Sequence, residues 1–485
     1  MRKIIFPVLF LLSGCASQYF RDADAPPAPQ PVSLSEWPHR ELWTGIVFNG
    51  DKIGFTRRAV RRVAGEPERY EIESEAVIRL RFLGIDKRIN MRALDRVRPD
   101  LTLEAFLYQH DIDGSPLKVE GSSDGRVLAY TVSATGSREE RRVELGEPLY
   151  PSSAVSFLPV MRGLAVGRTA KYAVFEGESQ QLTEAEQEVL AWQSSTLFEG
   201  RAFKLATRML GMETTTWIAA DGRPLFELGM NGVLISALEA EDTARRYVVE
   251  ASLNKRDGLV DFSLLRAGPI ASPRRAARME IALAGVPAGF EAPSDGGQRC
   301  AREAAELRCT VDRAAALDQQ PSARYLRPSF AVPSNLLEIT GLAKTLAAGA
   351  ATEDEKIDRF LAWIDANIAR EAIDSFTALD VLRERRAECQ GHAYLFAGLA
   401  RASGIPARIV NGLVYSEGHG GFLYHTWNEA WIAGRGWQPV DATFGQAHAD
   451  ATHLKLLEGE GLADLVPLVG LVGRISVSSL RAVAH

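Results

Sequence analysis

The hydrophobic pattern divides the chain into a long strand-rich part and a later part of mixed helices and strands. Over residues 41–255, apolar and polar residues alternate with the period of two that is typical of half-buried β-strands, as in WTGIVFNG and RVLAYTVSA. Turn sequences such as NGDK, DGSP and ADGR separate these runs. The pattern predicts a large antiparallel β domain in this range.

Over residues 331–460 the apolar spacing changes to that of amphipathic helices followed by strands. Thr352 and Glu355 give a capping-box sequence at the start of ATEDEKIDRFLAWIDANI, whose apolar residues recur three and four positions apart. A second cap at Thr377 precedes ALDVLRERR, and the helical segment QGHAYLFAGLARAS stops at the sequence GIP. Strand-like ARIVNGLVY, FLYHTWNEAWI and WQPVDATF follow. We therefore expect an α+β fold, with the β domain first and a domain of helices packed on an antiparallel sheet second.

Two shorter regions complete the predicted organisation. Residues 256–330 contain strand-like MEIALAGV and a candidate hairpin that sets Cys300 opposite Cys309. These two cysteines either form a disulfide or are two separately buried thiols. Residues 461–485 are expected to be a packed C-terminal tail, because the apolar piece LVPLVGLVG contains a proline and is too short to span a bilayer.

The N-terminus has the features of an export signal. Residues 1–14 combine Arg2 and Lys3 with a short apolar run, as a signal peptide does. The sequence LSGC at its end resembles the lipobox of bacterial lipoproteins, which implies cleavage before Cys15 and acylation of its sulfur. The alternative is an ordinary signal peptide with a cysteine here by chance. Ala16 stands where lipoproteins kept at the inner membrane usually carry aspartate, so the resemblance implies an outer-membrane anchor facing the periplasm.

Composition limits the organisation and the partners of the chain. Residues 15–40 are rich in proline and alanine without periodicity, so we expect an extended tether there. The 485 residues are enough for two or three domains, and 46% hydrophobic with 24% charged residues is typical of a folded globular protein. The net charge of -6, with no long basic run, argues against nucleic acid as a partner. Membrane attachment is therefore expected through the lipid alone.

One cysteine is left without an expected partner or anchor. Export brings the chain into an oxidising compartment, where an unpaired thiol is a liability unless its reactivity is used. Cys389 lies directly before QGHAYLFAGLARAS, where unpaired backbone N–H groups and the helix dipole favour a thiolate. His425 and Asp441 lie on consecutive predicted strands and supply a base and a carboxylate to orient it. The order predicts a Cys-His-Asp catalytic triad, although each residue alone also has a plain structural explanation.

Three segments that carry these residues resemble the transglutaminase-like superfamily. They are ECQGHAYLFAGLARASGIPARIVNGLVY, FLYHTWNEAWI and GWQPVDATFGQ. The resemblance implies a papain-like arrangement of a helix on an antiparallel sheet. It further implies that Cys389 is the nucleophile, that His425 is the general base and acid, and that Asp441 orients His425.

Neighbouring positions follow the family motif with one departure. Trp427 and Glu429 match the strand motif of the family. Ala387 and Glu388 precede the cysteine, where glycine and an acidic residue are more usual. The change from glycine to alanine reduces the flexibility of this turn but removes no catalytic group.

The resemblance implies covalent catalysis on an amide bond. Cys389 would attack the carbonyl carbon, its own backbone N–H would help to stabilise the oxyanion, and His425 would protonate the leaving amine. Water completing the cycle gives a hydrolase such as a cysteine protease, and an amine completing it gives an acyltransferase. Hydrolysis of a protein or peptide amide in the cell envelope is the favoured outcome. The competing class is a non-catalytic envelope lipoprotein that acts as a binding or scaffold module.

Other candidate sites in the sequence carry less weight. No CxxC, HxxxH or HExxH spacing supports a zinc site, so neither a metal nor another cofactor is expected. Gly121–Gly125 satisfies G-x-S-x-G but lies between strand-like pieces, which predicts a hairpin turn. His448 and His453 follow the last of these predicted strands, and the sequence assigns them no role.

Overall fold

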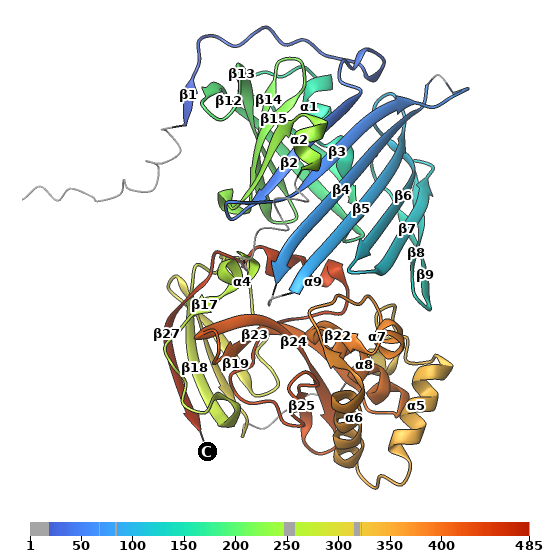
Figure 1. Ribbon diagram of the computed structural model, residues 1–485, viewed down its shortest axis with the longest axis vertical. Coiled ribbons are helices and arrows are strands. Elements are labelled where there is room, and N and C mark those ends of the chain that lie inside the picture. Colours follow the sequence, from blue (N-terminus) through green and yellow to red (C-terminus); the bar gives the residue numbers. More distant parts are fainter. Residues whose placement is uncertain are drawn as a thin grey trace, which may run out of the picture.

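The chain forms a large β domain and a smaller C-terminal body of helices and two sheets, set one above the other in Figure 1. The computed structural model describes residues 19–66, 68–82, 85–246, 258–314, 321 and 323–484. The expected signal peptide and Cys15 lie outside these residues. None of the described helices has the length and apolar character that crossing a membrane requires.

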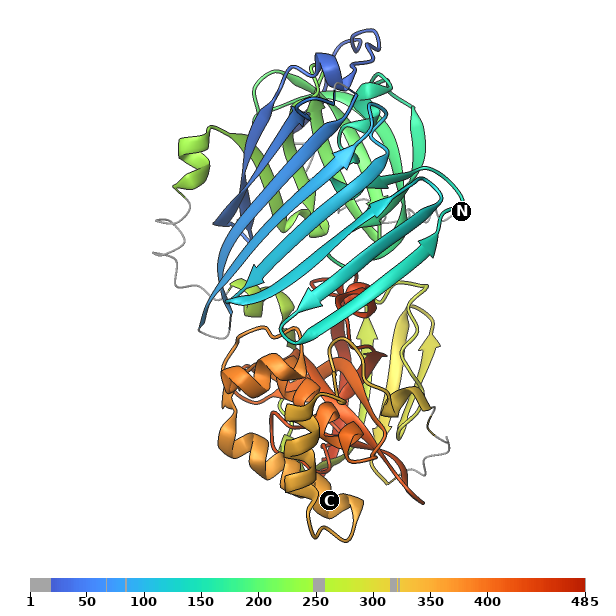
Figure 2. The same cartoon turned by 90° about the vertical axis from the view of Figure 1, so that its right-hand side faces the viewer.

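The β domain is one long, strongly curved sheet whose two halves face each other (Figure 2). The strands follow the order β10-β11-β12-β13-β14-β15-β16-β2-β3-β4-β5-β6-β7-β8-β9, and all neighbours are antiparallel except β10 and β11. Alternation builds its core, since Leu128, Tyr130 and Val132 of β8 are buried and the residues between them are half-buried. The strands are β1 (Phe20–Asp22), β2 (Glu41–Phe48), β3 (Asp51–Arg62), β4 (Tyr70–Phe82), β5 (Ile85–Val97), β6 (Leu103–Ile112), β7 (Ser115–Ser123), β8 (Val127–Ala134), β9 (Ser137–Glu144), β10 (Leu149–Pro151), β11 (Thr169–Glu176), β12 (Gln181–Ser195), β13 (Arg201–Met209), β14 (Met212–Ala219), β15 (Pro224–Gly229) and β16 (Leu234–Glu239).

The segment expected to be an extended tether is docked on the β domain at two points within its described part. Strand β1 pairs antiparallel with β12. Leu34 and Trp37 are buried in the core of the β domain. Between these two points residues 24–31 are exposed and lie outside helices and strands. The extended segment is therefore held at both ends of its described part, because a few apolar side chains suffice to dock a segment without periodicity.

The C-terminal body is built on an antiparallel sheet covered by helices. Its order is β17-β24-β23-β26, and β25 pairs with the same edge of β24 as β17, further along the strand. Helix α8 packs against β24 and β23, and α5, α6 and α7 surround it in one hydrophobic core. The predicted order, with a β-rich part first and a helix-containing part second, is confirmed. The elements are α5 (Leu337–Ala347), α6 (Glu353–Asn367), β21 (Ala369–Arg370), α7 (Ala378–Glu384), β22 (Arg386–Ala387), α8 (Cys389–Ala402), β23 (Ala407–Ser416), β24 (Gly421–Ile432), β25 (Gly436–Val440) and β26 (Leu454–Glu458), with β17 at Leu265–Arg266.

A second sheet combines the two regions that were expected as a small β region and a tail. Its order is β19-β20-β18-β27, so the last strand of the chain pairs with β18. Its core is shared with the first sheet, because Met279 packs in the same cluster as Leu413. Cys300 and Cys309 lie opposite each other on β19 and β20 and are joined by a disulfide. The elements are β18 (Ala276–Ala284), β19 (Gln298–Glu303), β20 (Glu306–Asp312), α9 (Leu462–Val469) and β27 (Ser476–Ala484).

The β domain contacts the C-terminal body through the ends of its hairpins. Ser115 Oγ donates a hydrogen bond to the backbone oxygen of Asp374 over 2.7 Å, and Ser137 Oγ donates to that of Phe330 over 2.8 Å. Phe330 and Phe376 of the C-terminal body pack against a core cluster of the β domain. These contacts bring the β domain to the segments that precede α5 and α7.

Candidate active site

Cys389 is the first residue of α8. Helix α7 begins at a capping box with Thr377 as N-cap and is followed by Arg385, whose φ of 61° turns the chain toward α8. The N-cap of α8, Glu388, makes no side-chain capping hydrogen bond, and a backbone bond runs from the His392 N–H to the Glu388 oxygen. The N–H groups of the residues between them have no partner inside the helix, so this end of α8 favours a negative charge at Cys389.

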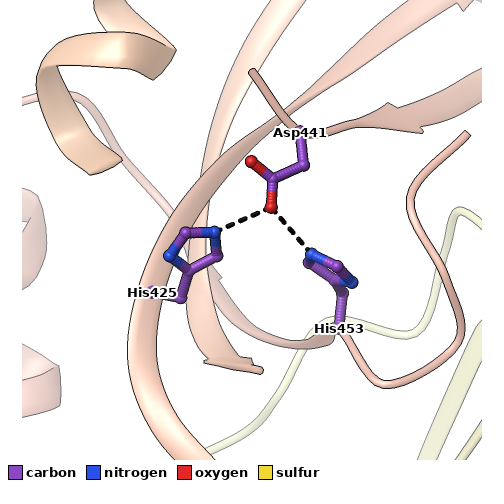
Figure 3. Close-up of side chains that lie close together, drawn as sticks. All are labelled: His425, Asp441 and His453. Carbon is purple, nitrogen blue, oxygen red and sulfur yellow. Dashed lines mark hydrogen bonds and ion pairs between the residues drawn. The ribbon is translucent and has the colours of Figure 1, made fainter. Parts of the chain in front are cut away.

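The sheet brings His425 and Asp441 together although they are 16 residues apart. Strands β24 and β25 pair in a register that sets Asn428 opposite Val440, and Asp441 follows directly after β25. The Nε2 atom of His425 lies 2.8 Å from Oδ2 of Asp441, as Figure 3 shows. His425 is 8% exposed and Asp441 is fully buried, so solvent screens this pair only weakly.

The sulfur of Cys389 completes the group. Cys389 is half-buried, forms no disulfide, and shares a side-chain hydrogen bond with His425. Because Nε2 of His425 faces Asp441, the other ring nitrogen is left for the sulfur. The structure thus brings all three residues of the predicted triad into one connected group, in which the imidazole can exchange a proton with sulfur while the carboxylate fixes its tautomer.

The charges around His425 favour its protonated form. Burial opposes the imidazolium charge, but the Asp441 carboxylate and the hydrogen bond to Cys389 outweigh burial and raise the pKa of His425 to about 9. Burial likewise opposes the charge of Asp441, yet His425 and His453 hold the pKa of this carboxyl well below its usual range. An imidazolium at His425 and a carboxylate at Asp441 are therefore the charge states expected near neutral pH.

A second imidazole, to which the sequence assigned no role, shares the carboxylate of Asp441. His453 Nε2 lies 3.0 Å from Oδ2 of Asp441, and His453 Nδ1 lies 3.0 Å from the backbone oxygen of Asp450. Both partners only accept hydrogen bonds, so both ring nitrogens of His453 donate and the ring is positively charged. Burial opposes this charge, but Asp441 and Asp450 outweigh burial and raise the pKa of His453.

The turn after Asp441 encloses the site. Oδ1 of Asp441 accepts the backbone N–H of Thr443 over 2.8 Å and that of Phe444 over 3.1 Å. The Phe444 ring is nearly parallel to the imidazole of His425, with 5.0 Å between their centroids, and the buried ring of Trp427 is nearly parallel at 6.2 Å. Two aromatic rings therefore restrict the orientation of His425, in addition to its hydrogen bonds.

His425, Asp441 and His453 also bring three potential metal ligand atoms within 4.8 Å of one another. Two histidines and a carboxylate are a ligand set that zinc accepts. An ion at this point would have to replace the hydrogen bonds that join both imidazoles to Asp441. The three residues could hold a metal, but their hydrogen bonds already satisfy one another without it.

Glu429, which matches the family strand motif, belongs to a separate buried ion network. Its carboxylate accepts from Arg408 Nε over 2.6 Å and from Lys455 Nζ over 3.1 Å, and all three residues are at most 4% exposed. Asp295, which lies before β19, also bonds to Arg408 over 3.0 Å. The network joins the two sheets of the C-terminal body. Glu429 therefore holds these sheets together and has a structural role.

A cavity of about 1020 Å³ lies between the β domain and the C-terminal body. Its walls include Ser137 and Glu139 of β9, Ser375 before α7, and Gln390 and Tyr394 of α8. Ligand pockets are commonly about 300–1,000 Å³, so this space has room for a peptide segment. Because Gln390 directly follows the nucleophile candidate, the cavity adjoins the first turn of α8 from the side of the β domain.

Comparison with known proteins covers the segment that carries these residues. The family model described as the transglutaminase-like superfamily matches residues 340–442. Kyphoscoliosis peptidase from Mus musculus is 31% identical over 129 residues, which are 24% of this chain and 19% of that protein. Its Homo sapiens counterpart is 32% identical over 124 residues, which are 22% of this chain and 18% of that protein. The chain thus spans less than a fifth of the length of these curated relatives.

Solved structures resemble the chain only distantly. The periplasmic domain of TgpA from Pseudomonas aeruginosa, bound to ethylmercury, is 17% identical with a TM-score of 0.27, over 38% of this chain and 88% of that one. At this TM-score the likeness does not support a functional assignment. The family match confirms the resemblance drawn from the sequence. Residues 340–442, which hold Cys389, His425 and Asp441, form a domain of the transglutaminase-like superfamily.

Proposed function

We propose that this protein is a cysteine-dependent enzyme of the transglutaminase-like type that cleaves or exchanges amide or peptide bonds. The observation that carries the proposal is the connected group of Cys389, His425 and Asp441. The sulfur stands half-buried at the start of a helix, and the carboxylate is fully buried behind the imidazole. The group contains a nucleophile, a residue that transfers protons and a residue that fixes the tautomer.

The proposed reaction starts from a thiolate at Cys389 and an imidazolium at His425. The sulfur bonds to the amide carbonyl carbon, and the carbonyl oxygen becomes an oxyanion near the free N–H groups of the first turn of α8. His425 then gives its proton to the amide nitrogen, the C–N bond breaks, and an acyl thioester remains on Cys389 while the amine leaves. Water that loses a proton to His425 attacks the thioester, the C–S bond breaks, and a carboxylic acid leaves while the Cys389 thiolate and the His425 imidazolium are restored. An amine in place of water forms a new amide.

We propose hydrolysis as the main outcome, with protein or peptide amides as substrates. Both curated relatives named above are called peptidases, which supports a hydrolase for the shared segment. Cys389 is only half-buried, and the cavity adjoins it through Gln390, so water has access to a thioester at this position. A transferase needs a site that excludes water more completely.

We also propose that the enzyme works at the bacterial cell envelope. The export sequence and the LSGC motif support a lipid on Cys15 that anchors the chain to the outer membrane on its periplasmic side. Growth with a radiolabelled palmitate tests the anchor. The wild-type chain should become labelled, and a Cys15→Ser variant should not.

The enzymatic proposal is tested with casein as a general amide substrate. Casein is incubated with the purified full-length chain, with and without a fluorescent primary amine. New peptide termini report hydrolysis, and fluorescent casein reports transfer. Cys389→Ala is expected to lower either product by more than about 100-fold while the Tm stays at the wild-type value, because the nucleophile is lost and the fold is kept.

The reactivity of the Cys389 thiol gives a second test of the proposed enzyme that needs no substrate. Iodoacetamide at pH 6 should label Cys389 faster than it labels free cysteine, because the helix start and His425 favour the thiolate. Slow labelling of Cys389, together with casein that stays intact and unlabelled, would refute the enzyme and favour a non-catalytic binding or scaffold lipoprotein.

A further inference from the structure

The β domain places a buried lysine close to the start of α8. Lys87 of β5 is 6% exposed, and its ammonium group forms an ion pair with Asp374 and lies 3.4 Å from Oδ2 of Asp113. Lys87 and Asp113 belong to the β domain, whereas Asp374 belongs to the loop between β21 and α7. A buried ion pair therefore crosses the boundary between the two parts of the chain.

Asp374 connects this lysine to the residue that precedes the nucleophile. The side chains of Asp374 and Glu388 share a hydrogen bond, and the Glu388 backbone N–H donates to the oxygen of Ile373 over 3.2 Å. Ser115 of β7 holds the same loop from the other side, since its hydroxyl donates to the Asp374 backbone oxygen over 2.7 Å. The β domain thus grips the loop that in turn holds the N-cap of α8, directly before Cys389.

The charges in this cluster must balance around a single ammonium group. Asp113, Asp374 and Glu388 all act on Lys87. Burial and the neighbouring Asp374 raise the pKa of Glu388 to about 8, although Lys87 opposes the shift. A hydrogen bond between two carboxyl groups needs one proton, so Glu388 holds it near neutral pH. Glu388 is then uncharged beside Cys389, where a second negative charge would oppose a thiolate.

We propose that Lys87 is a positioning residue for the nucleophile. Through Asp374 it holds Glu388, the N-cap of α8, in place directly before Cys389. The β domain is then part of the active site and does more than dock a substrate. This inference rests on the proposed function, because it concerns how Cys389 is made reactive.

The test measures how fast iodoacetamide alkylates Cys389 in the full-length chain between pH 5 and pH 9. Lys87→Met removes the charge and keeps an unbranched, slightly shorter side chain. It is expected to slow alkylation at pH 6 about tenfold and to move the profile about one pH unit upward, because the first turn of α8 then no longer holds its N–H groups in place against a thiolate at Cys389. Lys87→Arg should restore most of the rate. Lys118→Met, at an exposed lysine of β7, is the matched control and should leave the profile unchanged.

A double substitution separates positioning from a general loss of stability. Alanine in Glu388→Ala removes the side chain through which Lys87 is proposed to act, so adding Lys87→Met to it should move the profile no further. A Lys87→Met protein that is folded and has the wild-type profile overturns the inference, and so do shifts from the two substitutions that simply add.

Two further outcomes must be distinguished from a failure of the inference itself. Should Lys87→Met fail to fold, Asp374→Asn breaks the same connection, and a wild-type profile in that variant overturns the inference equally. Failure of the proposed function looks different, because wild-type Cys389 would then react like free cysteine and casein would stay unmodified whatever residue stands at position 87. Whether or not casein is a substrate, the difference between the wild-type and variant alkylation profiles measures the effect of Lys87 on Cys389.

Discussion

His453 Nε2 lies 3.0 Å from Oδ2 of Asp441, on the same oxygen that accepts a hydrogen bond from His425. One carboxylate oxygen therefore serves two imidazoles. His425 also faces the sulfur of Cys389, whereas His453 is 1% exposed and its second nitrogen is bonded to Asp450. His453 has no route to the reacting atoms, so we infer that it positions Asp441 and takes no part in proton transfer.

Replacing His453 should lower activity and change its pH dependence together. Phenylalanine fits a ring of similar size but donates no hydrogen bond to Asp441. A lost hydrogen bond to a charged group costs about 1.5–3 kcal/mol, which corresponds to a loss of about 10- to 100-fold in kcat/KM if Asp441 is no longer held in place. Without the positive charge of His453, Asp441 interacts with His425 alone, and the pKa of His425 should rise further. The fall of kcat/KM on casein at alkaline pH, the alkaline limb, should therefore move to higher pH. A folded His453→Phe protein with the wild-type kcat/KM and limb would contradict the positioning role.

His425 should set the alkaline limit of activity. Asp441 and Cys389 raise its pKa to about 9 against the opposing effect of burial, whereas an unfolded histidine titrates near about 6.5. The imidazolium that protonates the leaving amine is thus present up to about pH 9, and kcat/KM on casein should fall above that point. Because the pKa is raised in the folded state, the same group adds stability that is complete below about pH 6.5 and is lost as pH rises through about 9.

Asp441→Asn provides the control for this pH dependence. The substitution removes the charge that raises the pKa of His425, so the alkaline limb should move toward neutral pH. The fall in Tm between neutral and alkaline pH should become smaller in the same variant. An alkaline limb that stays in place in Asp441→Asn would show that another group sets it.

That Cys389, His425 and Asp441 come together could be predicted from the sequence because the signals are local. The capping box at Thr377 and the helix start at Cys389 depend on a few neighbouring residues. His453 could not be predicted, because it lies in the loop between β25 and β26. The path of this loop depends on Asp450, which accepts a hydrogen bond from Arg274, more than 170 residues earlier in the chain. The stretch from Asp450 to His453 has no periodicity that would mark the histidine as buried.

The organisation of the C-terminal part shows the same limit. Strand β27 has the alternating pattern SVSSLRAVA, but its partner β18 lies about 200 residues earlier, and local periodicity does not reveal which strands pair. Lys87 is a second case, since a lysine in an alternating strand is normally solvated and this one is buried between Asp113 of its own domain and Asp374 of the other body. Contacts between distant segments decide both features.

Glu429→Gln should destabilise the protein without acting on the chemistry. Its carboxylate is 2% exposed and is shared by Arg408 and Lys455, so removing its charge leaves two buried cations underpaired. Breaking a buried ion network typically costs about 3–5 kcal/mol. We expect the free energy of unfolding, measured by denaturant titration, to fall by about that amount. Alkylation of Cys389 in the folded protein should stay near the wild-type rate. Glu338→Gln, which breaks the exposed pair with Arg383, is the control and should change stability by less than about 0.5 kcal/mol.

The disulfide between Cys300 and Cys309 should stabilise the C-terminal body independently of catalysis. The two cysteines are 9 residues apart, and closing so short a loop stabilises a fold by about 2–3 kcal/mol in the chain-entropy description. The double variant Cys300→Ser and Cys309→Ser should therefore unfold at lower denaturant concentration, and wild type kept in dithiothreitol should match it. Alkylation of Cys389 in the folded double variant should keep the wild-type rate, because β19 and β20 lie in the second sheet and contribute none of the three triad residues. Faster or slower alkylation before any unfolding would show instead that the second sheet, through the core that it shares with β23, controls the geometry at the start of α8.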